Sequence, residues 1–354
     1  MINKVISYPQ MGNYSVVVYY LLKKILHCKV MKPEKITAKT IELGSKYSPD
    51  FVCMPFKYTL GTFIESLEKG ANVLIQAGGG CRNGYYSELQ EQILRDLGYN
   101  FTYINLVSKG KSNKYEIYKK IKSIDSKLNF FKVLYYLFIA IKMTKYMDII
   151  DNYIRKNIGF EVEKGSFNKL YNEMLANYGN SKCYLHLYRT YLKYYSKFKS
   201  VIIKKPDNCL KIGIIGELYT IMEPFSNYNL ENILALYKVE ITRFTNATYL
   251  LFQKKKMVKK YLKETQKYIK YKMGADAHDN IGRTKYLCEN NYDGIIHIKS
   301  SFCTPEIGAM PIIDKICKEY FTPIVYFSFD SNTSEVGIKT RIEAFIDMLN
   351  VRKK

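Results

Sequence analysis

Three cysteines of this chain precede segments that are expected to begin helices. Cys53 lies two residues before Pro55, Cys81 follows a run of three glycines, and Cys303 lies in a Ser-Ser-Phe-Cys-Thr-Pro stretch. In open parallel sheets, ligands bind beyond the carboxyl ends of the strands, where loops turn into helices. A helix N-terminus presents unpaired amides and partial positive charge, which stabilise a thiolate. We therefore expect Cys53, Cys81 and Cys303 to form one ligand-binding site.

The glycine run before Cys81 favours a bulky ligand. Gly79 and Gly80 lack a Cβ atom, so the backbone there can approach a ligand closely. A glycine-rich loop alone is a weak sign of phosphate binding, whereas one followed at once by a cysteine favours a cluster. Arg82, the next residue, would offset the negative charge of a cluster or would simply be a surface cation.

The remaining cysteines of the eight are predicted to fill the core, because a buried cysteine packs as a small hydrophobe. They are Cys28, Cys183, Cys209, Cys288 and Cys317. Core filling is also the alternative for each of the three site cysteines taken singly. No C-x-x-C pair occurs, which excludes zinc ribbons and ferredoxin-type runs. No secretion signal is visible, so the cysteines indicate a reducing cytoplasm rather than a disulfide framework.

Three polar residues are candidate catalytic groups. His297 lies on an expected strand six residues before Cys303, where it is either a proton donor or a hydrogen-bonded core histidine. Glu306 begins the helix after Cys303, where a carboxylate also suits the helix dipole. Glu217 follows the strand end Gly213–Gly216 and would face the same crevice.

The first 108 residues alternate short strands with helices of 10–15 residues, a pattern typical of a parallel, doubly wound sheet. The strands are expected at residues 4–8, 50–54, 72–76 and 103–107. The second of these would place Cys53 at the carboxyl end of a strand.

Residues 109–206 change to helical spacing with few glycines, and the α/β pattern resumes from 207 to 354. Strands there are expected at residues 210–215, 240–244, 294–298 and 324–329. The prediction is therefore an α/β protein with two Rossmann-like parallel-sheet domains, 1–108 and 207–354, joined by a helical bridging segment, 109–206.

Charge and hydrophobicity limit the classes of partner that the chain is expected to bind. The formal charge is +23, and nine lysines accompany a single Glu264 between residues 254 and 272. We interpret this stretch as the solvated face of an amphipathic helix; attraction to an anionic partner is the alternative. The apolar run 133–141 is too short to span a bilayer and predicts a buried helix. We expect a cytoplasmic protein that binds neither membrane nor nucleic acid.

Five motifs together resemble the 2-hydroxyacyl-CoA dehydratase and benzoyl-CoA reductase superfamily, most closely its activase-associated, double-cubane-type branch. They are residues 50–57 around Cys53, 78–86 around Cys81, 216–219 beginning Gly-Glu-Leu-Tyr, 297–306 ending Cys-Thr-Pro-Glu, and 340–345. The resemblance covers both α/β domains and is weakest in the helical middle.

This resemblance implies an iron–sulfur cluster, 4Fe-4S or a double cubane, held by Cys53, Cys81 and Cys303. It also implies a dehydratase or reductase component that accepts low-potential electrons from an ATP-dependent activator protein and acts on an acyl-CoA, in a homo- or heterodimer. The chain has no Walker-type phosphate loop of its own. Two alternatives stay open: a non-catalytic electron-transfer or accessory protein of an activator ATPase, and a structural zinc site with His297 as fourth ligand.

Overall fold

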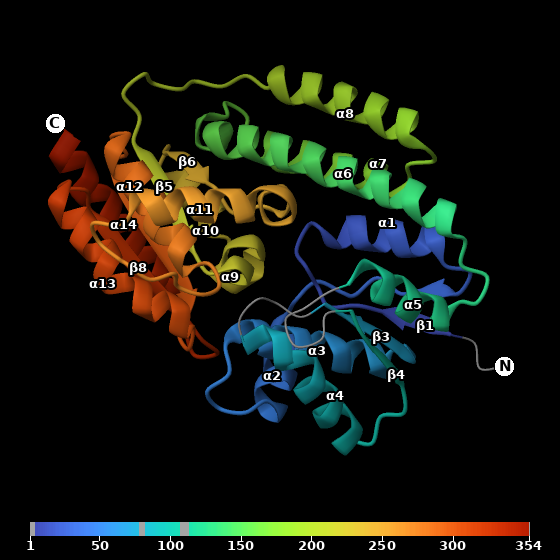
Figure 1. The fold of residues 1–354 in the computed structure, drawn as a ribbon. Coiled ribbons are helices and arrows are strands. Elements are labelled where there is room, and N and C mark those ends of the chain that lie inside the picture. Colours follow the sequence, from blue (N-terminus) through green and yellow to red (C-terminus); the bar gives the residue numbers. More distant parts are fainter. Residues whose placement is uncertain (1–3, 78–81, 107–112, 354) are drawn as a thin grey trace. The chain divides into compact units, whose positions relative to one another are not determined.

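The computed structural model describes residues 4–77, 82–106 and 113–353 (Figure 1). Contacts between Cα atoms divide the chain into two compact units, Met1–Lys142 and Met143–Lys354. Each unit contains one four-stranded sheet in which every strand pairing is parallel. The protein is thus α/β with two Rossmann-like parallel sheets, as the alternation of strands and helices predicts.

The sheet of the first unit has the order β2-β1-β3-β4. Its strands are β1 (Val5–Ser7), β2 (Lys29–Val30), β3 (Val73–Gln76) and β4 (Thr102–Asn105). The helices α1 (Ser15–Ile25), α2 (Ala38–Tyr47), α3 (Met54–Glu68) and α4 (Tyr86–Asp96) lie between them in the chain. One core packs α3 and α4 on the sheet through residues such as Phe56, Leu60 and Leu94.

The strand predicted at residues 50–54 is wrong. The second strand of the sheet is the short β2; residues 50–53 belong to the link between α2 and α3, and residue 54 begins α3. Pro55 lies in the first turn of α3, where its missing N–H costs nothing, so the helix begins directly after Cys53. Cys53 therefore lies at a helix N-terminus, as predicted, but follows a helix rather than a strand.

Four helices occupy the middle of the chain: α5 (Lys114–Ile124), α6 (Phe130–Asn157), α7 (Ser166–Gly179) and α8 (Tyr184–Lys199). The division between the two units falls inside α6. The apolar run 133–141 lies on α6 and is only partly buried, since Ile139 is inaccessible whereas Leu134 and Phe138 are exposed. No helix among the described residues is long and apolar enough to cross a membrane.

The sheet of the second unit repeats the topology of the first, in the order β6-β5-β7-β8. Its strands are β5 (Lys211–Gly216), β6 (Glu240–Arg243), β7 (Gly294–Ser300) and β8 (Ile324–Phe329). The main helices are α9 (Leu218–Met222), α10 (Leu230–Leu236), α11 (Lys254–Glu264), α12 (Ala277–Glu289), α13 (Thr304–Glu319) and α14 (Glu335–Lys353). Pro311 lies inside α13, which continues through it.

The two faces of this second sheet have separate cores. Ile296 and Ile298 of β7 face the cluster that includes α10 and α14. Ile295 lies on the other face of β7, in the cluster that includes α12 and α13. It is two residues before His297 and four before Lys299. Because side chains alternate along a strand, His297 and Lys299 lie on the α12 and α13 face.

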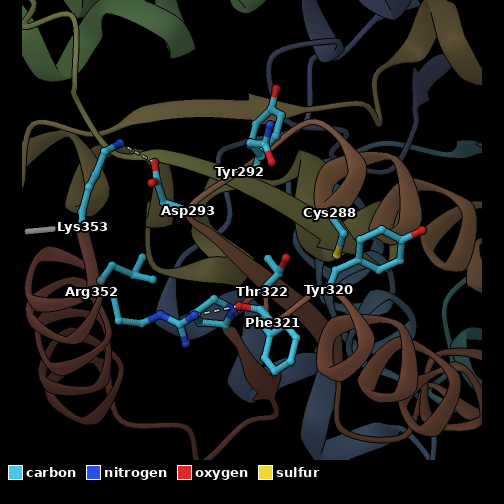
Figure 2. Close-up of a pocket in the computed structure, with 11 residues that line it drawn as sticks. Cys288, Tyr292, Asp293, Tyr320, Phe321, Thr322, Arg352 and Lys353 are labelled. Atoms are coloured by element: carbon cyan, nitrogen blue, oxygen red, sulfur yellow. Dashed lines mark hydrogen bonds and ion pairs between the residues drawn. The ribbon is translucent and has the colours of Figure 1, made fainter.

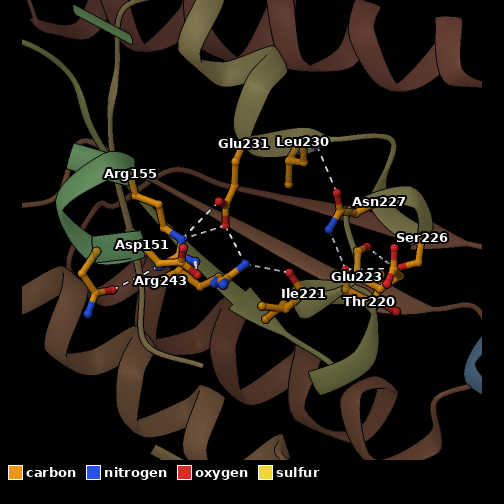
Figure 3. Close-up of polar contacts among 11 residues, drawn as sticks. Asp151, Arg155, Thr220, Ile221, Glu223, Ser226, Asn227, Leu230, Glu231 and Arg243 are labelled. Atoms are coloured by element: carbon orange, nitrogen blue, oxygen red, sulfur yellow. Dashed lines mark hydrogen bonds and ion pairs between the residues drawn. The ribbon is translucent and has the colours of Figure 1, made fainter. Parts of the chain in front are cut away.

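A cluster of charged residues, two buried arginines around a half-buried glutamate, joins α6 to this sheet (Figure 3). The Glu231 carboxylate of α10 accepts hydrogen bonds from Arg155 Nε of α6 at 3.0 Å and from Arg243 Nη1 of β6 at 2.7 Å. Arg155 Nη2 also donates to Asp151 at 3.1 Å. The arrangement fixes the end of α6 on the second unit.

Candidate functional site

Four of the predicted site residues lie at or near the carboxyl edge of the second sheet: Glu217, His297, Cys303 and Glu306. β5 and β7 are neighbours, and the chain leaves them toward opposite sides of the sheet, so their ends form the switch point where open α/β sheets bind ligands. Glu217 directly follows β5, and Cys303 lies three residues after β7. These two predicted site residues therefore lie at the edge of the sheet where such folds bind ligands.

Gly216 allows the two strand ends to meet closely. Its φ of 141° lies in the region that favours glycine, and an added Cβ would lie 1.8 Å from the carbonyl oxygen of Ile298. The amide of Glu217 donates to that same Ile298 oxygen at 2.9 Å. Glycine is thus required for the contact between β5 and β7 at this edge.

His297 and Glu306 form a buried pair. His297 Nε2 lies 2.8 Å from Glu306 Oε2, and neither residue is accessible to solvent. Asn280 of α12 donates from Nδ2 to Glu306 Oε2 at 2.9 Å and to the Gly216 carbonyl at 2.9 Å. These bonds join β5, β7, α12 and the first turn of α13 in one network.

Arg283 fixes the orientation of Asn280. Its Nη1 donates to Asn280 Oδ1 at 3.2 Å, so the amide group of Asn280 must turn Nδ2 toward Glu306. The guanidinium is buried and lies 4.5 Å from the centre of the Tyr249 ring. The other ring nitrogen of His297, Nδ1, has no hydrogen-bond partner among the described residues.

Glu217 is an N-cap with a raised pKa. Its carboxylate accepts from the amides of Tyr219 at 2.8 Å and Thr220 at 3.0 Å. Burial raises the pKa of Glu217 to about 7, although these hydrogen bonds act in the opposite direction. The carboxyl group can therefore hold or release a proton near neutral pH.

Cys303 is the N-cap residue of α13 and is half-buried. Its amide donates to the Ser300 carbonyl at 3.0 Å, which closes the turn between β7 and α13. Lys299, the next-to-last residue of β7, is buried in this turn. Burial lowers the pKa of Lys299, whereas the negative charges of Cys303 and Glu306 act to raise it.

Cys53 of the first unit also directly precedes a helix, although it follows α2 rather than a strand. It is the N-cap residue of α3, is buried, and its sulfur hydrogen-bonds with the Tyr86 hydroxyl. Gln90 of α4 connects α3 to β3. It donates to the Phe56 carbonyl of α3 at 3.1 Å and accepts from Gln76, the last residue of β3, at 3.0 Å. The start of α3 thus lies at the carboxyl edge of the first sheet.

The rest of the predicted site lies outside the described residues. Gly79, Gly80 and Cys81 fall in the undescribed stretch 78–81, and Arg82 begins a 3-10 turn, Arg82–Tyr85, with its side chain outside the description. Within the described residues, no three His, Cys, Asp or Glu side chains are grouped to hold a metal ion. The shared cysteine site therefore stays a prediction.

The two described site cysteines are compatible with an iron–sulfur cluster in one respect. Each lies at the N-terminus of a helix of at least 15 residues, with no hydrogen bond from its side chain to the helix amides. The thiols of Cys53 and Cys303 therefore do not cap their own helices, and the helix dipoles favour their thiolate forms.

A pocket of about 250 Å³ lies at the opposite, amino edge of the second sheet (Figure 2). Its lining includes Cys288, Asp293, Phe321, Arg352 and Lys353. Both cations are satisfied within the protein, because Arg352 donates to the Phe321 carbonyl and Lys353 to Asp293, each at 2.8 Å. None of the predicted site residues lines it.

Sequence reasoning missed Asn280, Arg283 and Lys299. Asn280 and Arg283 lie in a helix whose polar residues 278–280 interrupt the usual amphipathic pattern, which was the available signal of buried polarity. Lys299 lies on the same face of β7 as His297. Its burial depends on α12 and α13, so no pattern in the neighbouring sequence indicates it.

A comparison with protein families finds a match in the second unit. Residues 239–349 match the family model described as 2-hydroxyglutaryl-CoA dehydratase, D-component. The matched segment contains His297, Lys299, Cys303 and Glu306, and excludes Cys53, Cys81 and Glu217. The match confirms the resemblance to the 2-hydroxyacyl-CoA dehydratase superfamily. Among curated proteins, none matches the chain.

Proposed function

We propose that this chain, dehydratase-component-like over residues 239–349, is an iron–sulfur protein that accepts low-potential electrons from an ATP-dependent activator. The cluster would be held by Cys53, Cys81 and Cys303, and would serve reductive or radical dehydration of an acyl-CoA. When bound, such a cluster supplies single electrons at low potential. The double-cubane branch, the cytoplasmic location and a dimeric state belong to the same proposal.

The observation that carries the proposal is the setting of Cys303. It is the N-cap residue of α13 at the switch point of a parallel sheet, inside the segment that matches the family model, with a buried lysine four residues before it. Iron–sulfur association is also general in this family.

The neighbouring residues would divide the remaining work. His297, Glu306 and Asn280 are fully buried and would hold the first turn of α13, and so Cys303, in place. Glu217 would exchange a proton at the site, because its pKa of about 7 allows both protonation states under neutral conditions.

The test is anaerobic purification followed by iron and acid-labile sulfide analysis. A brown protein containing both is expected, and a colourless zinc protein would contradict the proposal. Cys53→Ser, Cys81→Ser and Cys303→Ser should each lose most of the iron. Cys183→Ser is the matched control, since Cys183 is likewise the N-cap residue of a helix, α8, but is not at a sheet edge. Full iron retention in Cys303→Ser would remove that ligand assignment.

The same preparation distinguishes an enzyme from an accessory protein. An enzyme should re-oxidise its reduced cluster faster when an acyl-CoA substrate is added. An electron-transfer or accessory protein should respond only to its protein partner. The second result would leave the iron–sulfur assignment in place and replace the catalytic one.

A further inference from the structure

Three lysines of α11 form a row along one side of the helix. Lys255, Lys259 and Lys263, here called the lysine row, recur at every fourth position, and all three are exposed. Side chains four residues apart are neighbours on a helix surface, so these ammonium groups lie together. Among the described residues, the ion pairs of α11 involve only its first residue and the pair Lys260–Glu264. The lysine row thus has no carboxylate partner in the described part of the chain.

The lysine row does not stabilise α11. Like charges four residues apart repel each other on a helix. The first turn of α11 contains three consecutive lysines, 254–256, and no acidic residue, although the helix dipole favours carboxylates there. Because a bound anion would relieve both effects, the row favours an anionic partner over a merely solvated face.

α11 begins at the carboxyl edge of the second sheet. Lys254, its first residue, donates from Nζ to Asp276 Oδ1 at 2.5 Å. Asp276 Oδ2 accepts from the amide of Leu218, the residue after Glu217, at 3.2 Å. The lysine row starts at the next residue of α11 and spans about 12 Å of helix axis. One end of the row therefore lies close to the strand end that precedes Glu217.

The chemistry of the lysine row favours a small ligand that carries several phosphates. Lysines bind phosphate oxygens as point charges. Every residue of α11 is described; none of its large apolar side chains is exposed, and its one aromatic residue, Tyr261, is buried. Protein interfaces have an apolar core, and single-stranded nucleic acids stack on aromatic rings, so α11 suits neither partner. It also has no arginine, the side chain that most often reads bases in a duplex.

We propose that the lysine row binds the phosphates of a coenzyme A thioester, an inference that rests on the proposed function. The nucleotide end of such a substrate carries a diphosphate and a 3′-phosphate, and its thioester lies at the far end of a flexible, uncharged arm. Phosphates held on α11 leave this arm free to extend toward the carboxyl edge of the second sheet. The three lysines position the substrate and do not touch the reacting atoms.

The test is isothermal titration calorimetry of the anaerobically purified protein with three probes. They are coenzyme A, dephospho-coenzyme A, which lacks the 3′-phosphate, and pantetheine, which lacks every phosphate. The row variant combines Lys255→Gln, Lys259→Gln and Lys263→Gln. It should bind coenzyme A about tenfold more weakly than the parent protein, because three exposed ion pairs are lost. The loss should be smaller for dephospho-coenzyme A and absent for pantetheine, and arginine at the same three positions should keep the parent affinity.

The control variant changes the net charge equally on another surface. It replaces three exposed lysines on or next to α8 with glutamine: Lys182, Lys193 and Lys199. Its affinity for coenzyme A should stay close to that of the parent protein, and equal losses in the two variants would show a general effect of charge and overturn the inference. Circular dichroism checks that both variants fold. Lys259→Gln alone, in the middle of the row, repeats the comparison with a smaller expected loss if the triple variant does not fold.

The other outcomes separate this inference from the proposed function. Equal affinity of the parent protein and the row variant for coenzyme A overturns the inference alone. Parent protein that holds iron but binds no coenzyme A overturns the inference together with the acyl-CoA part of the proposed function. Parent protein without iron overturns the iron–sulfur part, whereas weaker coenzyme A binding by the row variant would still support the phosphate site. A row variant that loses binding to a duplex oligonucleotide or to polyglutamate, but not to coenzyme A, would indicate a nucleic acid or an acidic protein and contradict the inference.

Discussion

His297 Nε2 lies 2.8 Å from Glu306 Oε2, and this bond joins the middle of a parallel strand to the first turn of the helix that follows it. Glu306 stands three residues after Cys303, so the bond also sets where that cysteine lies relative to β7. Asn280 and the Gly216 carbonyl extend the network to α12 and β5. The arrangement of the switch point therefore depends on a few buried polar contacts.

Loss of the Glu306 carboxylate should destabilise the second unit strongly. Glu306→Ala leaves His297 and Asn280 buried without their shared acceptor, and we expect a loss of about 3–5 kcal/mol in the free energy of unfolding. Urea unfolding followed by circular dichroism measures it. Glu343→Ala, at an exposed position of α14, is the control and should change little. Equal stabilities of the two variants would show that the network is not structural.

Gly216→Ala should strongly destabilise the second unit. The new Cβ would lie 1.8 Å from the Ile298 carbonyl oxygen at a φ of 141°, so the ends of β5 and β7 must separate. We expect a loss of about 3 kcal/mol or more in unfolding free energy. Gly274→Ala is the control, because no atom lies within 4 Å of its added Cβ. Thermal melting of both variants decides the point.

Glu217 should make stability depend on pH. Its folded pKa, about 7, lies above the ordinary 4.5, so the folded state holds the proton more tightly. The stabilisation is present in full below pH 4.5 and is lost as the pH rises through 7. Glu217→Gln keeps a neutral side chain at every pH. Its free energy of unfolding, measured relative to that of the parent protein, should therefore rise by about 3 kcal/mol as the pH increases from 5 to 8. A difference that does not vary with pH would contradict the assignment.

The sequence predicts the second unit better than the first for physical reasons. β7 and α13 have strong local patterns, so Cys303 could be placed at a strand end from the chain alone. The second strand of the first sheet has only two residues, Lys29–Val30, and its pairing with β1 comes from tertiary structure. With no strong strand pattern at residues 29–30, the apolar residues before Pro55 are the better match to a strand, which explains the wrong prediction at residues 50–54. Burial of Lys299 and Asn280 likewise depends on helices packed from elsewhere in the chain.

Glu231 provides a prediction of opposite sign to that for Glu217. Burial alone would raise the pKa of Glu231, but the charges of Arg155 and Arg243 outweigh it and hold the pKa below its usual value. Its contribution to stability is therefore present above the ordinary pKa and is lost as the pH falls through the lowered one. Glu231→Gln leaves both guanidinium groups without their anion.

The Glu231 side chain is 30% exposed, so water screens its charge in part. We therefore expect Glu231→Gln to lose about 2 kcal/mol of unfolding free energy at pH 7, less than the loss of a fully buried pair would cost. The difference from the parent protein should shrink in acid, where Glu231 itself becomes neutral. Glu335→Gln is the control: it breaks an exposed pair with Lys339 at 2.8 Å and should have little effect at either pH. Urea unfolding at pH 7 and in acid measures both variants, and a loss that persists unchanged in acid would mean that packing rather than charge holds α6 to β6 and α10.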